Sequence, residues 1–220
     1  MVRPDSYALL EAALHARGLR LLTDAQAYAR THLLPGTLEA LRPWSAPAVL
    51  LPAGRPGALR AALDGFGTRA LVVKDWVKSQ AGLWDEACFI PHADDAGHAL
   101  AVIARFLDLQ GPDLQGGVVL REWRPLVQRA GRAVEWRCFV AGGVPLPSFR
   151  RDPEPPGDAL PPPPAALLHA AANAVDSPFW TMDWALQVEG GHLLLEAGDG
   201  GVSGIPEHVD PAPILRALLR

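Results

Sequence analysis

The chain has 220 residues, of which 49% are hydrophobic and 20% charged, a balance typical of a globular protein with one large domain or two small ones. No apolar run is long enough for a membrane-spanning helix, and charged residues interrupt the N-terminal apolar stretch, so we expect a cytoplasmic protein. The net charge of −4 argues against a general nucleic-acid binder, and the two cysteines form neither a disulfide framework nor a zinc pattern.

The first third of the chain reads as alternating short helices and strands. Apolar periodicity and capping residues predict helices over 5–17, from Thr23-Asp24 to about His32, and over 56–63. Short β-branched and leucine-rich runs predict strands over 19–22, 48–51 and 71–74.

The remaining two thirds contain longer strands. We expect strands over 87–90, 118–122 and 134–140, with a helix from Asp94 to Gly111. Seven prolines between residues 153 and 164 indicate a loop, and a helix near 165–175 leads into a hairpin of 179–188 and 192–196. A last helix begins near Pro211. Adjacent antiparallel strands mixed with helices indicate an α+β protein in two lobes.

Basic residues are unevenly distributed. The stretch from Arg121 to Arg151 holds seven arginines and two glutamates, which suits a compact anionic ligand better than a long polymer. All but two of the 20 basic residues of the chain are arginine. The two lysines, Lys74 and Lys78, lie four residues apart, either by chance or because a compact ammonium binds phosphate in a way that guanidinium does not reproduce.

The hairpin carries two acidic residues that could bind a metal. A two-residue turn at Gly190-Gly191 would pair Glu189 with His192, which makes Asp183 and Glu196 diagonal neighbours on one face. Carboxylates there would suit Mg²⁺, with Asp199 in the following glycine-rich loop as a third ligand. The alternative is that both are solvated surface acids. Because like charges repel, we expect alanine at position 183 or 196 to leave the fold intact.

Arg137 is the candidate cation of the central strand. Alternation places it on one face with Glu135 and Phe139, opposite an apolar face that would contact the core. A guanidinium on a sheet could clamp a phosphoryl group. It could equally form a structural pair with Glu135 or with an acid on a neighbouring strand.

With these residues in view, the chain resembles the ATP-grasp superfamily, and within it the short bacterial and phage ATP-grasp-domain proteins of unassigned substrate. The resemblance spans roughly residues 60–206 and rests on six blocks in matching order, at 72–79, 84–91, 119–123, 135–140, 181–184 and 196–204. It implies an ATP-grasp fold with nucleotide between two α+β lobes, over about 61–122 and 123–220. A reduced N-terminal region over 1–60 would precede this ATP-grasp domain of 61–220.

The resemblance also implies roles for individual residues. Lys74 would contact the ATP phosphates and Arg137 the transferred phosphate, both as catalytic residues. Arg121, Glu122 and Trp123 would bind the nucleotide, the last two where the family's interlobe segment holds adenine and ribose. Asp183 and Glu196 would hold Mg²⁺.

Three departures from the family pattern bear on these roles. Residues 79–85 replace the usual glycine-rich flap, so Lys78 could supply phosphate-binding charge instead. Gly198 stands where many relatives have a metal-binding Asn, which is why Asp199 is considered as a ligand. The chain is also shorter than most ATP-grasp ligases.

The resemblance therefore implies an ATP-dependent ligase that activates a carboxylate as an acylphosphate, ATP going to ADP, for attack by an amine or similar nucleophile. Its substrates would be small-molecule or peptide carboxylates and amines, with Arg124, Arg150 and Arg151 as candidate anion ligands. The alternatives are an ATP-binding regulatory or docking module without turnover, and a kinase-like or RNA-end ligase using the same pocket. The oligomeric state stays open.

Overall fold

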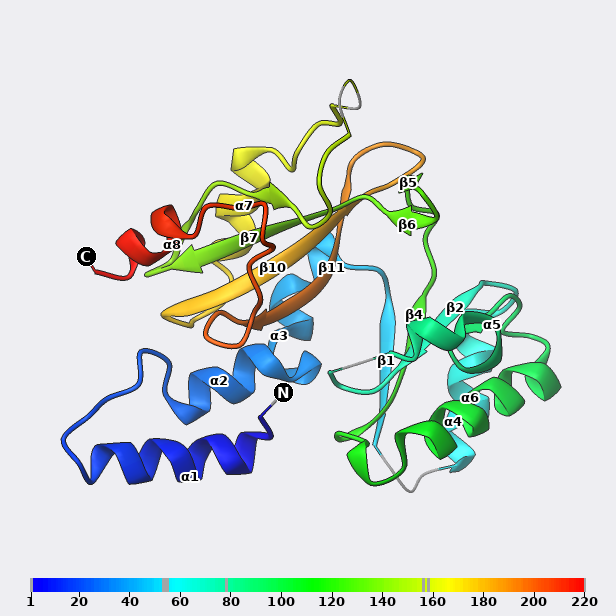
Figure 1. Cartoon of the computed structure of the whole chain (residues 1–220). Helices are drawn as coiled ribbons and strands as arrows, with labels where there is room; N and C mark the ends of the chain where they lie inside the picture. Colours follow the sequence, from blue (N-terminus) through cyan, green and yellow to red (C-terminus); the bar gives the residue numbers. More distant parts are fainter. Residues whose placement is uncertain (1, 53–55, 78, 156, 158, 220) are drawn as a thin grey trace. The chain divides into compact units, whose positions relative to one another are not determined.

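The computed structural model describes residues 2–52, 56–77, 79–155, 157 and 159–219, and the chain forms two compact units. The larger unit contains residues 1–45 and 125–220, and the smaller one residues 46–124. Both mix helices with antiparallel strands, so the expected α+β class is confirmed (Figure 1). No helix among the described residues has the length and hydropathy needed to cross a membrane.

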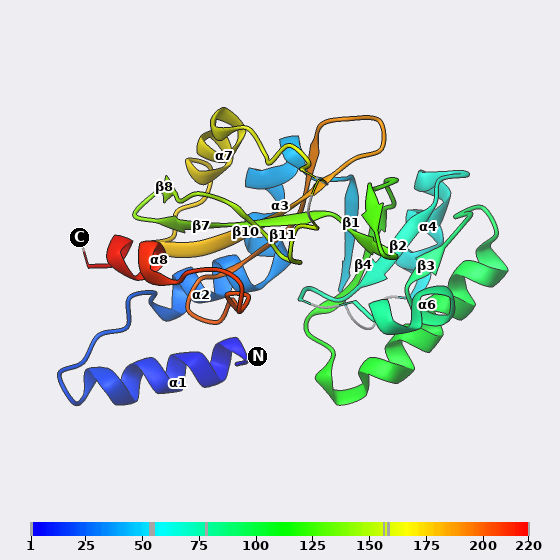
Figure 2. The same cartoon turned by 45° about the horizontal axis from the view of Figure 1, so that its top comes forward.

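The smaller unit is an antiparallel sheet with helices on one face. Its strands are β1 (Ala48–Pro52), β2 (Leu71–Lys74), β3 (Phe89–Ile90) and β4 (Gly117–Glu122), in the order β1-β4-β2-β3. Helices α4 (Pro56–Phe66) and α6 (Ala96–Gln110) pack on it, and Figure 2 shows them beside the sheet. A short helix, α5 (Trp84–Ala87), and the 3₁₀ turns η2 (Ala81–Leu83) and η3 (Gly111–Asp113) complete the unit.

Alternation along the strands separates the two faces of this sheet. Leu71, Val73, Val118 and Leu120 point into a core with the helices because these residues alternate with Val72, Lys74 and Val119. The helix-free face therefore carries Val72, Lys74, Val119 and Arg121. This face is where the sequence-predicted phosphate ligand Lys74 lies.

The larger unit is built on a second antiparallel sheet. Its order is β11 (His192–Asp199), β10 (Phe179–Leu186), β7 (Glu135–Ala141) and β8 (Val144–Pro145), and β9 (Phe149–Arg150) also pairs with β7. A two-residue hairpin, β5 (Gln128–Arg129) and β6 (Arg132–Ala133), precedes β7.

Helices cover one face of this sheet. α3 (Leu34–Leu41) and α7 (Ala165–Ala172) pack on Trp180, Met182 and Trp184, all fully buried. α1 (Pro4–His15) and α2 (Ala25–His32) pack on each other, α2 also contacts β11, and the 3₁₀ turn η1 (Arg42–Trp44) follows α3. α8 (Ala212–Ala217) contributes Ile214 to a small cluster with Phe139 and Phe179 on the opposite face.

Several expected elements differ from the structure. The strand expected over 19–22 is absent from the described chain, where these residues form a bend between α1 and α2. Residues 84–87, partly assigned to a strand, begin with the helical turn α5. The units divide at 45/46 and 124/125, not at 60/61 and 122/123, because β1 pairs along its whole length with β4.

Candidate functional site

Three charged residues stand in one row across the sheet of the larger unit. Asp183 on β10 lies directly opposite Arg137 on β7 and directly opposite Glu196 on β11. Partners across antiparallel strands point to the same face, so all three side chains share the face opposite α3 and α7. The sequence-predicted acidic pair and the predicted cation are thus brought together.

A β-bulge produces this alignment. From Trp184 to Leu186, β10 pairs with β11 in one register, and between Asp183 and Trp184 that register shifts by one residue. Without the shift, Leu195 would lie opposite Asp183. The two strands are joined by the five residues 187–191, not by a two-residue turn at Gly190-Gly191, so the expected diagonal placement was wrong and the pair is directly opposed.

The Arg137 guanidinium is held at three points. Nε and Nη2 donate to the two carboxylate oxygens of Asp183 at 2.8 and 2.7 Å, and Nη1 donates to the carbonyl oxygen of Gly204 at 2.9 Å. The two side chains are 13% and 4% exposed. Burial would lower the Arg137 pKa, but the bonds to Asp183 raise it above its usual value, so the arginine stays charged. Of the two roles open from sequence, the pair with an acid on a neighbouring strand is present.

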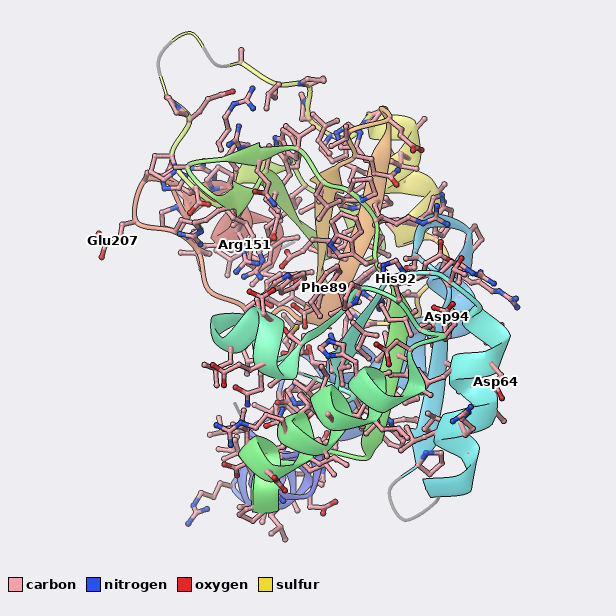
Figure 3. The ribbon with its side chains drawn as sticks, turned by 90° about the vertical axis from the view of Figure 1, so that its right-hand side faces the viewer. Asp64, Phe89, His92, Asp94, Arg151 and Glu207 are labelled. Atoms are coloured by element: carbon pink, nitrogen blue, oxygen red, sulfur yellow. The ribbon has the colours of Figure 1, made fainter. Side chains whose placement is uncertain are left out.

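Arg151 extends the row on the β7 side. Its Nη1 donates to Glu135 at 2.9 Å and to Asp183 at 3.3 Å, and its backbone amide donates to the Glu135 carbonyl. Burial raises the Glu135 pKa, and the positive charge of Arg151 opposes that shift. Arg151 is 41% exposed and is labelled in Figure 3, where Glu207 of the loop before α8 projects outward. A bound anion could reach this guanidinium.

Arg150 points away from the site, although it adjoins Arg151. It lies opposite Trp136, on the other face of β7, with its guanidinium 5.2 Å from the Trp136 ring centroid. Its side chain is 8% exposed, and Glu154 approaches Nη1 at 3.9 Å. Only Arg151 of this pair can therefore contact a ligand at the charged row.

Asp183 and Glu196 fit a magnesium ion that also binds a nucleotide. Both supply carboxylate oxygens from adjacent strands, and Glu196 is exposed. Within the described ranges, no group of three or more His, Cys, Asp or Glu side chains is placed to hold a metal. Two carboxylates completed by phosphate oxygens are a normal magnesium environment, whereas an all-protein site would need more ligands.

Asp199 does not join the acidic pair. β11 extends through Gly198 to Asp199, which lies opposite Trp180, so its side chain points to the helix-covered face. It is 1% exposed. The sequence interpretation ended the strand at Glu196 and treated Asp199 as a loop residue, and the three additional strand residues reverse the direction of its side chain.

The smaller unit places two predicted nucleotide ligands together. Lys74 lies opposite Val119, and Arg121 lies opposite Val72, so the two cations are neighbours on the helix-free face of β2 and β4. Phe89 lies opposite Val72 on the same face and is labelled in Figure 3. The sequence-predicted residue Lys78 lies outside the described residues.

Glu122 is not brought to that face. It lies opposite Leu71, and its side chain, 9% exposed, accepts from Arg69 at 3.2 Å and pairs with Arg124 at 2.9 Å. The Trp123 amide donates to Ala70, and the Trp123 ring meets the Phe89 ring edge-on at 5.6 Å. Arg124, a candidate substrate ligand from sequence, is in this structure a partner of Glu122.

Sequence reasoning missed two contacts that complete these clusters. The Gly204 carbonyl bonded to Arg137 has no sequence signal, because any residue supplies a carbonyl. Arg69, the partner of Glu122, is 53 residues away in sequence, and no local pattern links them. Alternation along β7 and β10 was the signal that did work.

Comparisons with known proteins follow the same division. A family model of the ATP-grasp domain, the third family of its clade, matches residues 63–218. No curated protein matches the chain.

Solved structures with this fold share little sequence with the chain. D-alanyl-alanine synthetase A from Vibrio cholerae is 16% identical, with 96% of this chain and 71% of that one covered and a TM-score of 0.62. The D-alanine–D-alanine ligase of Bacillus anthracis, complexed with ATP, is 15% identical, with 97% and 73% covered and a TM-score of 0.63.

The N5-carboxyaminoimidazole synthase of Aspergillus clavatus, in complex with ADP and its ribonucleotide, is 16% identical with a TM-score of 0.62. The match covers 100% of this chain and 58% of the synthase, so the larger protein has parts without a counterpart here. At these identities the likeness shows the fold. Together with the match to the family model, it shows that the chain belongs to this family of ATP-grasp domains.

Proposed function

We propose that the chain is an ATP-dependent ligase that activates a carboxylate as an acylphosphate for attack by an amine. The observation that carries the proposal is the direct opposition of Asp183 and Glu196 beside Arg137, in a chain that belongs to an ATP-grasp family. The substrates would be small-molecule or peptide carboxylates and amines, and the compartment would be the cytoplasm.

The smaller unit would bind most of the nucleotide. Lys74 and Arg121 share one sheet face with apolar side chains, a combination that suits a phosphate chain next to a base. Trp123 and Phe89 offer aromatic surface for adenine. Two of the fold relatives were solved with ATP or ADP bound, which supports a nucleotide ligand.

The larger unit would supply the charges around the transferred phosphoryl group. Asp183 and Glu196 would hold Mg²⁺, which neutralises phosphate charge when bound. Arg137, fixed by Asp183 and Gly204, is pre-organised to stabilise charge without reorientation. Arg151 can leave Glu135 for an anionic substrate because it is the more exposed arginine of the row.

The proposed reaction has two steps. A carboxylate oxygen of the substrate attacks the γ-phosphorus of ATP, the bond to the β–γ bridging oxygen breaks, and ADP leaves. The amine then attacks the acyl carbon, the C–O bond to phosphate breaks, and inorganic phosphate leaves as the amine loses a proton. Positioning and charge neutralisation supply most of the rate enhancement in phosphoryl transfer.

Two measurements test the proposal. Mg-ATP binding is measured by calorimetry, and ADP release is measured with pooled carboxylates in the presence of hydroxylamine, which traps acylphosphates as hydroxamates. We expect binding and carboxylate-dependent hydroxamate formation, both lost in Glu196→Gln. Binding without turnover would identify a regulatory module, and AMP release with RNA would identify an RNA-end ligase. Either result would contradict the ligase assignment.

A further inference from the structure

Asp199 is a buried carboxylate that the proposed chemistry does not use. It is 1% exposed, and its Oδ2 accepts no hydrogen bond of standard geometry from the described residues. Burial raises its pKa, an effect opposed by the Gly201 amide, the Thr23 side chain and the Val202 amide. Burying such a group is costly, so its surroundings must use it or compensate for it.

On one side, the carboxylate meets the two N-terminal helices. Thr23, 3% exposed, lies beside Asp199, and the Thr23 carbonyl accepts from the Tyr7 hydroxyl at 2.8 Å. The Tyr7 ring stacks on Tyr28 at 3.8 Å between centroids. Burial, and then the charge of Asp199, raises the pKa of both tyrosines to about 12. The α1–α2 pair is therefore closed over this carboxylate.

On the other side, Asp199 shapes the loop of residues 200–204. Its Oδ1 accepts from the Gly201 amide at 2.9 Å, and its own carbonyl accepts from the Ser203 hydroxyl at 2.8 Å. The Ser203 hydroxyl also lies 2.8 Å from the Thr181 hydroxyl. A Cβ on Gly200 would come within 2.5 Å of the Phe179 ring, so the loop packs tightly on the sheet.

The loop ends at the charged row. Gly204 directly follows Ser203, and its carbonyl accepts from Arg137 Nη1 at 2.9 Å. Arg137 in turn forks onto Asp183 through Nε and Nη2. A continuous set of hydrogen bonds thus runs from Asp199 through the loop to the guanidinium.

We propose that Asp199 is a positioning residue that ties helices α1 and α2 to the Arg137 guanidinium through the loop 200–204. The N-terminal helices then belong to the catalytic machinery of the larger unit and are not a separate substrate region. The part concerning turnover rests on the proposed ligase function, whereas the part concerning the Arg137 guanidinium does not.

The first test follows the guanidinium itself. In ¹⁵N-labelled full-length protein, NMR measures the hydrogen-exchange rate of Arg137 Nε–H, assigned by its loss in Arg137→Lys. We expect Asp199→Ala to accelerate this exchange at least tenfold, and Asp199→Asn and Thr23→Val to accelerate it less. Asp210→Asn is the matched control, because Asp210 likewise accepts a backbone amide, that of Ala212 at 2.9 Å, but is exposed. It should leave the rate unchanged.

An unchanged Arg137 rate in folded Asp199→Ala would overturn the proposal. So would an equal acceleration at every amide of the larger unit, which would indicate a general loss of stability. If Asp199→Ala does not fold, Thr23→Val and Gly200→Ala take its place, since they perturb the connection from the helix side and from the loop side.

The second test uses turnover. Asp199→Asn should lower kcat with the KM for ATP nearly unchanged, and should have no further effect in an Arg137→Lys background, since both changes act on one guanidinium. Additive effects would overturn the proposal. If the wild-type chain shows no ligase activity, the proposed function fails while the exchange result still decides the role of Asp199.

Discussion

At the residue scale, the Asp183 carboxylate neutralises two arginines at once. Asp183→Ala would leave Arg137, 13% exposed, without its bidentate partner, and removing one member of a buried pair costs roughly 3 kcal/mol or more. We therefore expect a clear loss of stability in urea unfolding. The expectation that alanine here would leave the fold intact assumed that the nearest charges were acidic, and it overlooked Arg137.

Glu196→Ala is the matched comparison, because Glu196 lies across the strand from Asp183 but is exposed. It should change the unfolding midpoint far less while weakening Mg²⁺-dependent nucleotide binding. Equal destabilisation by the two variants would show that the pair is structural as a unit.

Lys74 is a second residue-scale case. The chain uses arginine at all but two basic positions, yet it retains lysine at the end of β2. If Lys74 contacts phosphate, Lys74→Arg should weaken Mg-ATP binding roughly ten- to a hundredfold, equivalent to about 1.5–3 kcal/mol. Calorimetry measures this, with Arg60→Lys on the exposed side of α4 as a control. Unaltered affinity in Lys74→Arg would remove Lys74 from the phosphate site.

At the element scale, the hairpin shows how far alternation can lead. It placed Asp183 and Glu196 on one face because the side-chain period of two does not depend on knowing the partner strand. It could not reveal the bulge or the length of β11, since both depend on packing against β7 and the N-terminal helices. The misassigned strand over 19–22 has the same origin, because leucines in a bend resemble a short strand.

The proline-rich segment over 153–164 is tied to β11 by a histidine. His192 Nε2 lies 3.0 Å from the Pro161 carbonyl, and its ring meets the Trp136 ring edge-on. Burial lowers the His192 pKa, and the Pro161 carbonyl opposes that shift. The folded state therefore binds a proton less readily than the unfolded state, and stability is lost as the pH falls through about 6.5 towards the folded pKa.

We expect the melting temperature to drop between pH 7.5 and pH 5.5, and His192→Gln to drop less over the same interval. A measurement at pH 8, where His192 is neutral in both states, separates the lost contact from the titration. If the variant and the wild type lose the same amount on acidification, other groups cause the acid sensitivity.

At the scale of the whole molecule, the two compact units could not be delimited from sequence. β1 joins the smaller unit through pairing with β4, across more than 60 residues of sequence. The helices before it join the larger unit, where Tyr7 and Tyr28 close over Asp199. Long-range pairings of this kind leave no local pattern, whereas the family blocks from Val72 onward identified the fold.

The division into units gives the proposed function a test at this scale. The proposed nucleotide ligands include Lys74 and Arg121 from the smaller unit and Arg137, Asp183 and Glu196 from the larger one. A ligand that binds only the native state stabilises it by RT ln(1 + [L]/Kd), or ~2.7 kcal/mol at a hundredfold excess over Kd. Mg-ATP should therefore raise the melting temperature, whereas Mg²⁺ alone should not.

Hydrogen exchange then shows which unit gains protection. If residues of both units bind the nucleotide, the amides of Leu120 on β4 and Trp180 on β10 should both exchange more slowly with Mg-ATP, because opening either unit would release ligand contacts. In Lys74→Arg both gains should shrink together. Protection confined to Leu120 would exclude Arg137, Asp183 and Glu196 as nucleotide ligands, and protection confined to Trp180 would exclude Lys74 and Arg121.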